Sequence, residues 1–458
     1  MITATQAPER YLEAFEQFSI RSATAHAWLK SLRQEGFARF AETGFPTTHD
    51  EDWRFTSITP IAQTDFKAAA KVSVDPSDLE AFGGAGFVCR LVFVNGRFAR
   101  ELSQLPALPG GVAITGLAEA ISANPKGVEQ HLGQYLNCQR DSFAALNTAF
   151  MEDGIYVHVP RGTILAQPVY VLYISVPGDV PAVEHPRNLI VVEENSQATI
   201  VEDYVTLQNG GAASSFSNAA TELVAAPNAV VSHYMIVRQS DESYNVSTLR
   251  IQQGRSSNVS THSLLLSSAL ARNNVHPVLA GEGAECLING LFMANGREHM
   301  DNYMLVEHAA PHCNSRQFYN GILNGHGHGV FHGRIIVHKD AQKTDAKQTN
   351  RNLLLSDEAQ IDTKPQLEIY ADDVKCTHGA TIGQVEENAL FYLRSRGLDE
   401  NAARHLLLLA FANECLERMT SQALRKHLER LVMEWLPEAA RYAGAKPAAA
   451  ERTWEEAG

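Results

Sequence analysis

Residues 325–383 read GHGHGVFHGRIIVHKDAQKTDAKQTNRNLLLSDEAQIDTKPQLEIYADDVKCTHGATIG. This stretch holds strand-like runs rich in β-branched and apolar residues, and similar runs separated by Gly, Asn, Ser and Asp precede it. After Gly383 the pattern becomes helical and stays so. The stretch therefore lies where the chain changes from strands to helices, and the spacing of its strand runs decides the fold class.

The strand runs recur with a constant period. One set begins near Ser214, Tyr244, Asn273, Asp301, Gly329 and Ala359. A second, interleaved set comprises AVVSHYMIV from Ala229, NVSTHSLLL from Asn258, AECLINGLFM from Ala284, NSRQFYNGIL from Asn314 and AKQTNRNLLL from Ala346. Both sets repeat about every 30 residues, which predicts a β-helix or flattened β-solenoid with two strands per coil. A double-sheet jelly roll, the rival fold, would not require a constant period.

Helical patterns flank the repeats. Residues 1–150 are expected to be mostly helical, with Tyr11, Phe15 and Phe18 on one helix face, and to contain a hairpin turning at Asn95-Gly96. Residues 151–384 form the expected β-helix domain and residues 385–437 a helical domain. Residues 438–458 are rich in Ala, Glu and Pro, which is typical of a disordered tail.

The C-terminal helices carry more apolar surface than a solvent-exposed helix needs. One is apolar almost all round from Leu406 to Phe411, and the next has an apolar stripe that ends at Trp435. Such surface has to be covered by the domain or by another protein. We therefore predict a partner-binding surface that includes Leu406, Phe411 and Trp435.

Composition excludes several classes of protein. The chain has 458 residues and a formal net charge of -14, which argues against nucleic acid or anionic lipid as a partner. Its six cysteines form no CxxC pair, so no disulfide framework is predicted. No secretory signal or membrane-spanning run is visible, which predicts a cytoplasmic protein. The P-loop, GxSxG and HExxH motifs are absent.

The histidines that open the quoted stretch are the first metal candidates. On a strand, His326, His328 and His332 would point to one side of the sheet, and His338 follows shortly after. The favoured interpretation is nevertheless a turn with surface or cross-strand hydrogen-bonding histidines, because no acidic partner is near in sequence.

Cys376 and His378 are the second candidates. Two residues apart on an extended segment they share a face, and both are good ligands for iron or zinc. Two side chains alone do not hold a structural metal, so a partner would have to complete such a site. A buried cysteine beside a structural histidine explains the spacing equally well.

Longer motifs carry a resemblance to a known family. The run AQKTDAKQTNRNLLLSDEAQIDTKPQLEIYADDVKCTHGATIG, the following ENALFYLRSRG and the segment DEDWRFT at residues 50–56 closely resemble the SufD family of the Suf iron-sulfur cluster assembly machinery. The run Lys375–Gly379 favours SufD over the paralogous SufB. The likeness spans most of the chain.

The resemblance implies a central right-handed parallel β-helix between N-terminal and C-terminal helical regions. It also implies a non-catalytic scaffold subunit of the SufBCD complex, paired with SufB through the β-helix and bound to the ATPase SufC through the C-terminal helices. A transient iron-sulfur cluster would form at the SufB interface with His378 as a ligand, while the role of Cys376 is open. No cofactor is expected to stay bound, no flavin is assigned although flavin is associated with the complex, and a homodimer of the isolated chain is left open.

Two further expectations concern this interface. The apolar runs between Leu353 and Ile369 are expected to pair edge to edge with SufB, and Asp372 and Asp373 to orient the His378 imidazole. The alternative function is a solenoid enzyme such as a polysaccharide lyase or a metal-dependent oxygenase. Lyases of this kind are usually exported and need clustered acids with a basic catalytic residue, and the chain shows neither feature.

Overall fold

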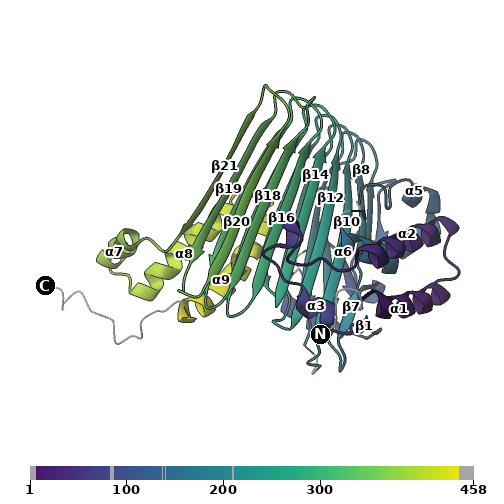
Figure 1. Cartoon of the computed structure of the whole chain (residues 1–458), viewed down its shortest axis with the longest axis horizontal. Helices are drawn as coiled ribbons and strands as arrows, with labels where there is room; N and C mark the ends of the chain where they lie inside the picture. Colours follow the sequence, from purple (N-terminus) through teal and green to yellow (C-terminus); the bar gives the residue numbers. More distant parts are fainter. Residues whose placement is uncertain (1–6, 83–86, 137, 140, 209–210, 443–458) are drawn as a thin grey trace.

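A computed structural model describes residues 7–82, 87–136, 138–139, 141–208 and 211–442. Two parallel sheets face each other and are wound from alternate strands of the chain, so that each coil contributes one strand to each sheet (Figure 1). The result is a parallel β-solenoid of about eight turns with helices at both ends. The solenoid expectation is confirmed, and the jelly roll is excluded because neighbouring solenoid strands pair in parallel.

The first sheet, sheet A, has the strand order β20-β18-β16-β14-β12-β10-β8-β5-β4, with β7 beside β10 and β1 beside β7. Its strands are β1 (Lys67–Ala68), β4 (Ala113–Gly116), β5 (Ile155–Val159), β7 (Ala182–Glu184), β8 (Arg187–Val192), β10 (Ser215–Ala225), β12 (Ser243–Gln253), β14 (Leu270–Leu279), β16 (His299–His308), β18 (His328–Val337) and β20 (Gln360–Ile369).

The second sheet, sheet B, has the order β21-β19-β17-β15-β13-β11-β9-β6-β2-β3. Its strands are β2 (Cys89–Val94), β3 (Arg97–Phe98), β6 (Val169–Ser175), β9 (Gln197–Thr206), β11 (Val230–Arg238), β13 (Asn258–Ser267), β15 (Glu285–Ala294), β17 (Asn314–Leu323), β19 (Asp345–Leu354) and β21 (Lys375–Gly383).

A recurring turn sets the period of the solenoid. On the way from sheet A to sheet B, successive coils place one residue in the left-handed region of backbone conformation. These residues are Asn195, Asn228, Ser256, Gly283, His312 and Lys343, with φ between 54° and 69°. Asn and Gly adopt this conformation most readily, and it reverses the chain within a few residues. The coils therefore keep nearly equal length and stack in register.

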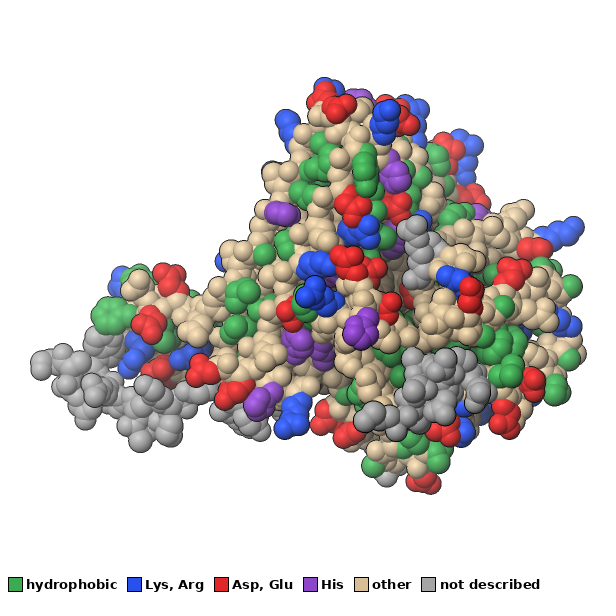
Figure 2. Space-filling view, in the orientation of Figure 1, with side chains coloured by type: hydrophobic (Ala, Val, Ile, Leu, Met, Phe, Trp, Pro, Cys, Tyr) green, Lys and Arg blue, Asp and Glu red, His purple; other side chains and the backbone are tan. Residues whose placement is uncertain are grey.

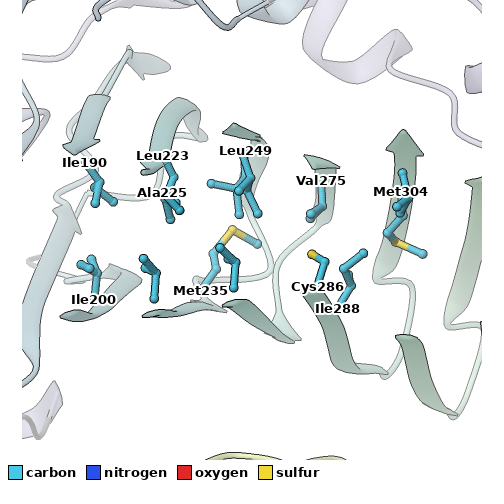
Figure 3. Close-up of a cluster of buried hydrophobic side chains, with 14 of the residues drawn as sticks. Ile190, Ile200, Leu223, Ala225, Met235, Leu249, Val275, Cys286, Ile288 and Met304 are labelled. Atoms are coloured by element: carbon cyan, nitrogen blue, oxygen red, sulfur yellow. The ribbon is translucent and has the colours of Figure 1, made fainter. Parts of the chain in front are cut away.

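The core lies between the two sheets. Because side chains alternate along a strand, every second residue points inward. Leu249 and Val275 of sheet A point toward Met235, Cys286 and Ile288 of sheet B, and all five are at most 4% exposed (Figure 3). Burying an aliphatic side chain of this size stabilises the fold by roughly 1.5–3 kcal/mol.

The N-terminal helices lie at the end of the solenoid where the chain enters it (Figure 1). They are α1 (Ala7–Arg21), α2 (Ala27–Thr43), α3 (Thr59–Gln63), α4 (Leu117–Ala123), α5 (Pro125–Glu129) and α6 (Ser142–Phe150). Tyr11, Phe15 and Phe18 are buried on one face of α1, as predicted. The predicted hairpin is also confirmed, since β2 and β3 pair antiparallel around the Asn95-Gly96 turn.

The sheets begin earlier in the chain than the expected start of the β-helix at residue 151. Strand β2 continues sheet B in parallel with β6, and β4 pairs with β5 of sheet A. The segment before residue 151 is thus a mixture of helices and of strands that extend both sheets.

Three C-terminal helices follow β21, namely α7 (Glu387–Ser395), α8 (Glu400–Leu416) and α9 (Gln422–Tyr442). Leu408 of α8 and Leu428 of α9 pack in one cluster with Leu291 and Ile322 on the outer face of sheet B. Helix α9 runs past the expected boundary at residue 437, and residues 443–458 of the expected tail lie outside the described residues. No helix in the described part of the chain is both long and apolar enough to cross a membrane.

Candidate functional site

The solenoid ends in two strands that have a neighbour on one side only. β20 is the last strand of sheet A and β21 the last strand of sheet B. Pro365 lies within β20, where it offers no backbone donor, and this is typical of an edge strand. Among the described residues no further strand continues either sheet, so the free backbone groups of β20 and β21 form an open end that another chain can extend.

Side chains at this end are more exposed than their counterparts one coil earlier. Ala346 of β19 is fully buried, whereas Cys376, its pairing partner on β21, is half-buried against the core. Ile382 of β21 is 51% exposed. The core is thus open at the last coil, because no described strand covers its inward-facing side chains.

Cys376 and His378 lie side by side on this inward face of β21. They are two residues apart on a regular strand that pairs with β19, so their side chains leave the same side of the backbone. His378 is exposed, and its imidazole makes no hydrogen bond with any described residue. Burial raises the pKa of the Cys376 thiol, so at neutral pH the sulfur is protonated until a metal displaces the proton.

The expected orienting role of the two aspartates is not what the structure shows. Asp373 forms an ion pair with Lys343, and its backbone N–H donates to Gln342 Oε1 at 2.9 Å. Asp372 is exposed at the turn that precedes β21. No hydrogen bond joins either residue to His378 in the described structure, and the Asp373 carboxylate is engaged by Lys343.

Gln348 is the polar residue nearest to His378 in the strand ladder, a feature that the sequence did not reveal. It lies directly opposite His378 on β19 and is 1% exposed. Its Nε2 donates to Gln317 Oε1 at 3.0 Å, whereas its buried Oε1 accepts no hydrogen bond in the described structure. An unsatisfied buried acceptor is costly, so this oxygen is available to a donor placed on β21.

The described residues do not complete a metal centre at this end. Within the described ranges, no group of three or more His, Cys, Asp or Glu side chains is arranged to hold a metal ion. Cys376 and His378 can therefore supply two ligands at most, and the remaining ligands would have to come from outside the described residues.

The favoured interpretation of residues 326–338 is confirmed for the cross-strand hydrogen bonds but wrong about the turn, because His328 and His332 lie on strand β18. His332 Nε2 bonds to Gln366 Oε1 at 2.8 Å, and His338 Nε2 lies 3.3 Å from Glu307 Oε2. His328 Nε2 lies 2.8 Å from Asp362 Oδ2. His326 is exposed in the turn before β18 and is not on the strand.

The argument that no acidic partner is near these histidines was wrong. Asp362 is 34 residues from His328, and Glu307 is 31 residues from His338. These separations equal one coil, so the acids are neighbours in the adjacent strand although they are remote in sequence. Figure 2 shows histidines, purple, at several separate places on the face of the molecule that is turned to the viewer.

The predicted partner-binding residues of the C-terminal helices are divided between surface and core. Leu406 is 45% exposed, but Phe411 is buried against sheet B with the Arg351 guanidinium over its ring. Trp435 is half-buried, and the rest of its stripe on α9 packs against α8 and sheet B. The stripe is thus covered by the chain itself. The larger exposed side chains lie on α7, where Phe391 is 61% and Tyr392 55% exposed.

Comparison with known proteins gives the class to which this architecture belongs. Residues 175–411 match the family model described as the SufBD core domain of SUF system FeS cluster assembly, and residues 5–171 match the SufBD protein N-terminal region. The chain belongs to the SufBD family of iron-sulfur cluster assembly proteins.

Individual relatives agree with this assignment over almost the whole chain. An iron-sulfur cluster assembly SufBD family protein of Synechocystis is 34% identical over 93% of this chain and 95% of its own length. The iron-sulfur cluster assembly protein SufD of Escherichia coli is 32% identical over 89% of this chain and 93% of its own. Protein ABCI7, chloroplastic, of Arabidopsis thaliana is 28% identical over 90% and 87%. The resemblance to SufD is confirmed.

Proposed function

We propose that this protein is a non-catalytic scaffold subunit that supplies one half of a site for nascent iron-sulfur clusters, and that a SufB chain supplies the other half. The observation that carries the proposal is the open end of the solenoid, where Cys376 and His378 share one face of an edge strand that is paired on one side only. A solenoid partner can add a strand to β21 and thereby bring its own ligands to these two side chains.

The ligand chemistry suits a cluster that is cargo. Thiolate and imidazole both bind iron, and replacing thiolate by imidazole changes the electronic properties of a cluster. An imidazole ligand can also be lost by protonation, which favours release. The exposure of His378 leaves it accessible to an incoming cluster, whereas Cys376 is half-buried and holds its proton more tightly. We therefore assign His378 the larger role.

We further propose Gln348 as the residue that orients His378, in place of the two aspartates. A ligating histidine generally donates its second ring N–H to an oxygen acceptor, which fixes the ring. The unpartnered Oε1 of Gln348, opposite His378 in the ladder, is an acceptor of this kind. Gln348 is thus a positioning residue and not a ligand.

Binding of the ATPase SufC is assigned to α7 and the start of α8. Phe391, Tyr392 and Leu406 support this assignment because they are large apolar side chains exposed on neighbouring helices. Exposed aromatic and aliphatic groups of this kind commonly anchor protein interfaces. The cytoplasm remains the proposed location, and we assign no flavin site.

The substitution His378→Ala tests the cluster role. We expect a complex of normal composition and thermal stability in which cluster formation in cells falls roughly 10-fold or more, because an exposed imidazole without protein contacts contributes little to folding. Cys376→Ala should have a milder effect. The matched control is Thr377→Ala, which changes the exposed residue between them on the opposite face of β21. Normal cluster formation by an intact His378→Ala complex would refute the ligand role.

A further inference from the structure

Two histidines on the outer face of sheet A face each other at close range. Nδ1 of His299, the first residue of β16, lies 3.1 Å from Nδ1 of His328, the first residue of β18. The two residues are paired neighbours in the sheet, and their rings stand at 83° to each other. The site is separate from the open edge of β21 and belongs to this chain alone.

In each ring, the oxygen atom that contacts Nε2 determines whether Nε2 carries a proton. Thr56 Oγ1 donates to Asp301 Oδ2 at 2.6 Å, because the Asp301 carboxylate is paired with Arg272 and can only accept. Thr56 has a single hydroxyl proton, so its oxygen must accept from His299 Nε2–H at 2.9 Å. His299 therefore carries its proton on Nε2 and presents a lone pair at Nδ1.

The same reasoning applies to the second ring. His328 Nε2 lies 2.8 Å from Asp362 Oδ2, and a carboxylate accepts, so the Nε2–H of His328 donates to it. Its Nδ1 then also presents a lone pair. With both rings neutral, two lone pairs converge across 3.1 Å, which is repulsive unless a proton or a metal ion lies between them.

Two geometric observations favour a metal ion over a shared proton. Two nitrogen ligands bound to one transition-metal ion at about 2.0–2.1 Å are separated by roughly 3.0–3.4 Å, which matches the observed spacing. Each ring has its second N–H held by an oxygen, the arrangement that orients metal-ligating histidines.

Space for further ligands exists beside the pair. A cavity of about 320 Å³ adjoins both histidines and is lined in part by Phe55, Ser57 and Tyr244. It is large enough for several water molecules, which can complete the coordination of an ion held by only two protein ligands. We propose that His299 and His328 form a binding site for a divalent first-row transition metal, the class that prefers imidazole, with water in the remaining positions.

Titration with Co²⁺ and Zn²⁺ tests the proposal, Co²⁺ serving as a spectroscopic probe. The tag-free full-length protein is stripped with chelator and carries Cys376→Ser and His378→Gln, so that the cluster site proposed above does not contribute. We expect one equivalent of metal to bind with cobalt absorption bands of nitrogen and oxygen ligation. His328→Gln and His299→Gln should abolish this binding, and Asp362→Asn should weaken it roughly 10- to 100-fold.

The matched control is His332→Gln on the same strand and the same face. His332 bonds to Gln366 in the adjacent strand, as His328 bonds to Asp362, but it has no imidazole nitrogen opposite it. It should leave metal binding unchanged. If no metal binds up to about 1 mM, or if His328→Gln and His332→Gln bind alike, the proposal is overturned. A ¹⁵N spectrum showing a protonated Nδ1 in the metal-saturated protein would equally overturn it. Should His299→Gln fail to fold, His328→Gln and Asp362→Asn decide the question.

Discussion

At the scale of single residues, a fully buried ion pair between β8 and β10 lies where the N-terminal region packs on the solenoid. Arg187 Nη2 and Glu222 Oε1 are 2.5 Å apart, and both side chains are fully buried. Glu222 also accepts from the backbone N–H groups of Gly133 and Tyr135, at 2.7 and 2.9 Å. Glu222 thus satisfies donors from a loop about 90 residues away in sequence, while Arg187 reaches Thr148 of α6.

We expect Glu222→Gln to destabilise the protein by about 3–5 kcal/mol, because it leaves the Arg187 charge buried without a counter-ion. Urea unfolding followed by circular dichroism measures the change. Replacing both partners by apolar residues, as in Arg187→Met with Glu222→Leu, should recover part of the loss, since no unpaired charge then remains. A single substitution that costs less than about 1 kcal/mol would contradict this account of the pair.

Residue chemistry was only partly predictable from the sequence. Cys376 and His378 could be placed on one face from their spacing, because alternation along a strand is a local rule. The partners Asp362, Glu307 and Gln348 could not be found locally, because each lies in the adjacent coil. Once a repeat of about 30 residues is recognised, residues one repeat away become candidate contacts, and a search at that distance would have located all three.

At the scale of secondary-structure elements, a run can pair with a partner chain only if it lies on the last strand of a sheet. The segment from Leu353 to Ile369, which holds these apolar runs, contains the end of β19 and all of β20. β19 is paired on both sides, by β17 and β21, so the run NRNLLL is not at an edge. β20 and β21 are the edge strands. The sequence could not distinguish these cases, because a periodic pattern does not show where pairing stops.

The C-terminal helices show a second limit of pattern reasoning. The stripe on α9 correctly indicated an apolar face, but that face is covered by sheet B and α8 and is closed to a partner. Periodicity identifies a buried face without identifying what buries it. Truncation after Gly397 would uncover the outer face of sheet B, so loss of SufC binding in such a protein would not separate interface from stability.

Point substitutions on α7 give a cleaner test of the proposed SufC surface. We expect Phe391→Ala with Tyr392→Ala to lower the affinity for SufC roughly 10-fold or more, as truncation of exposed aromatic anchors commonly does, with no change in SufB pairing. Surface plasmon resonance with purified SufC measures the effect. Met433→Ala, at a residue of α9 that is 43% exposed, is the control. Unchanged SufC affinity in the α7 variant would place the interface elsewhere.

At the scale of the whole molecule, the two ends of the solenoid carry different elements of the chain. The N-terminal helices α1 and α2 lie at one end, while the uncapped coil and α7 lie at the other, and α9 packs across the outer face of sheet B (Figure 1). The free strand edge and the exposed side chains of α7 are thus both located where the chain leaves the solenoid. The fold places the proposed cluster ligands and the proposed ATPase surface on consecutive elements, β21 and α7.

Pulsed electron paramagnetic resonance of the assembled complex tests the shared site most directly. The complex is prepared with ¹⁵N-histidine in this chain only and its cluster is reduced to a paramagnetic state. We expect a ¹⁵N hyperfine coupling of the size given by a directly bound imidazole, present with His326→Ala and lost with His378→Ala. A cluster without ¹⁵N coupling from this chain, or a coupling that survives His378→Ala, would contradict the assignment of His378 as a cluster ligand.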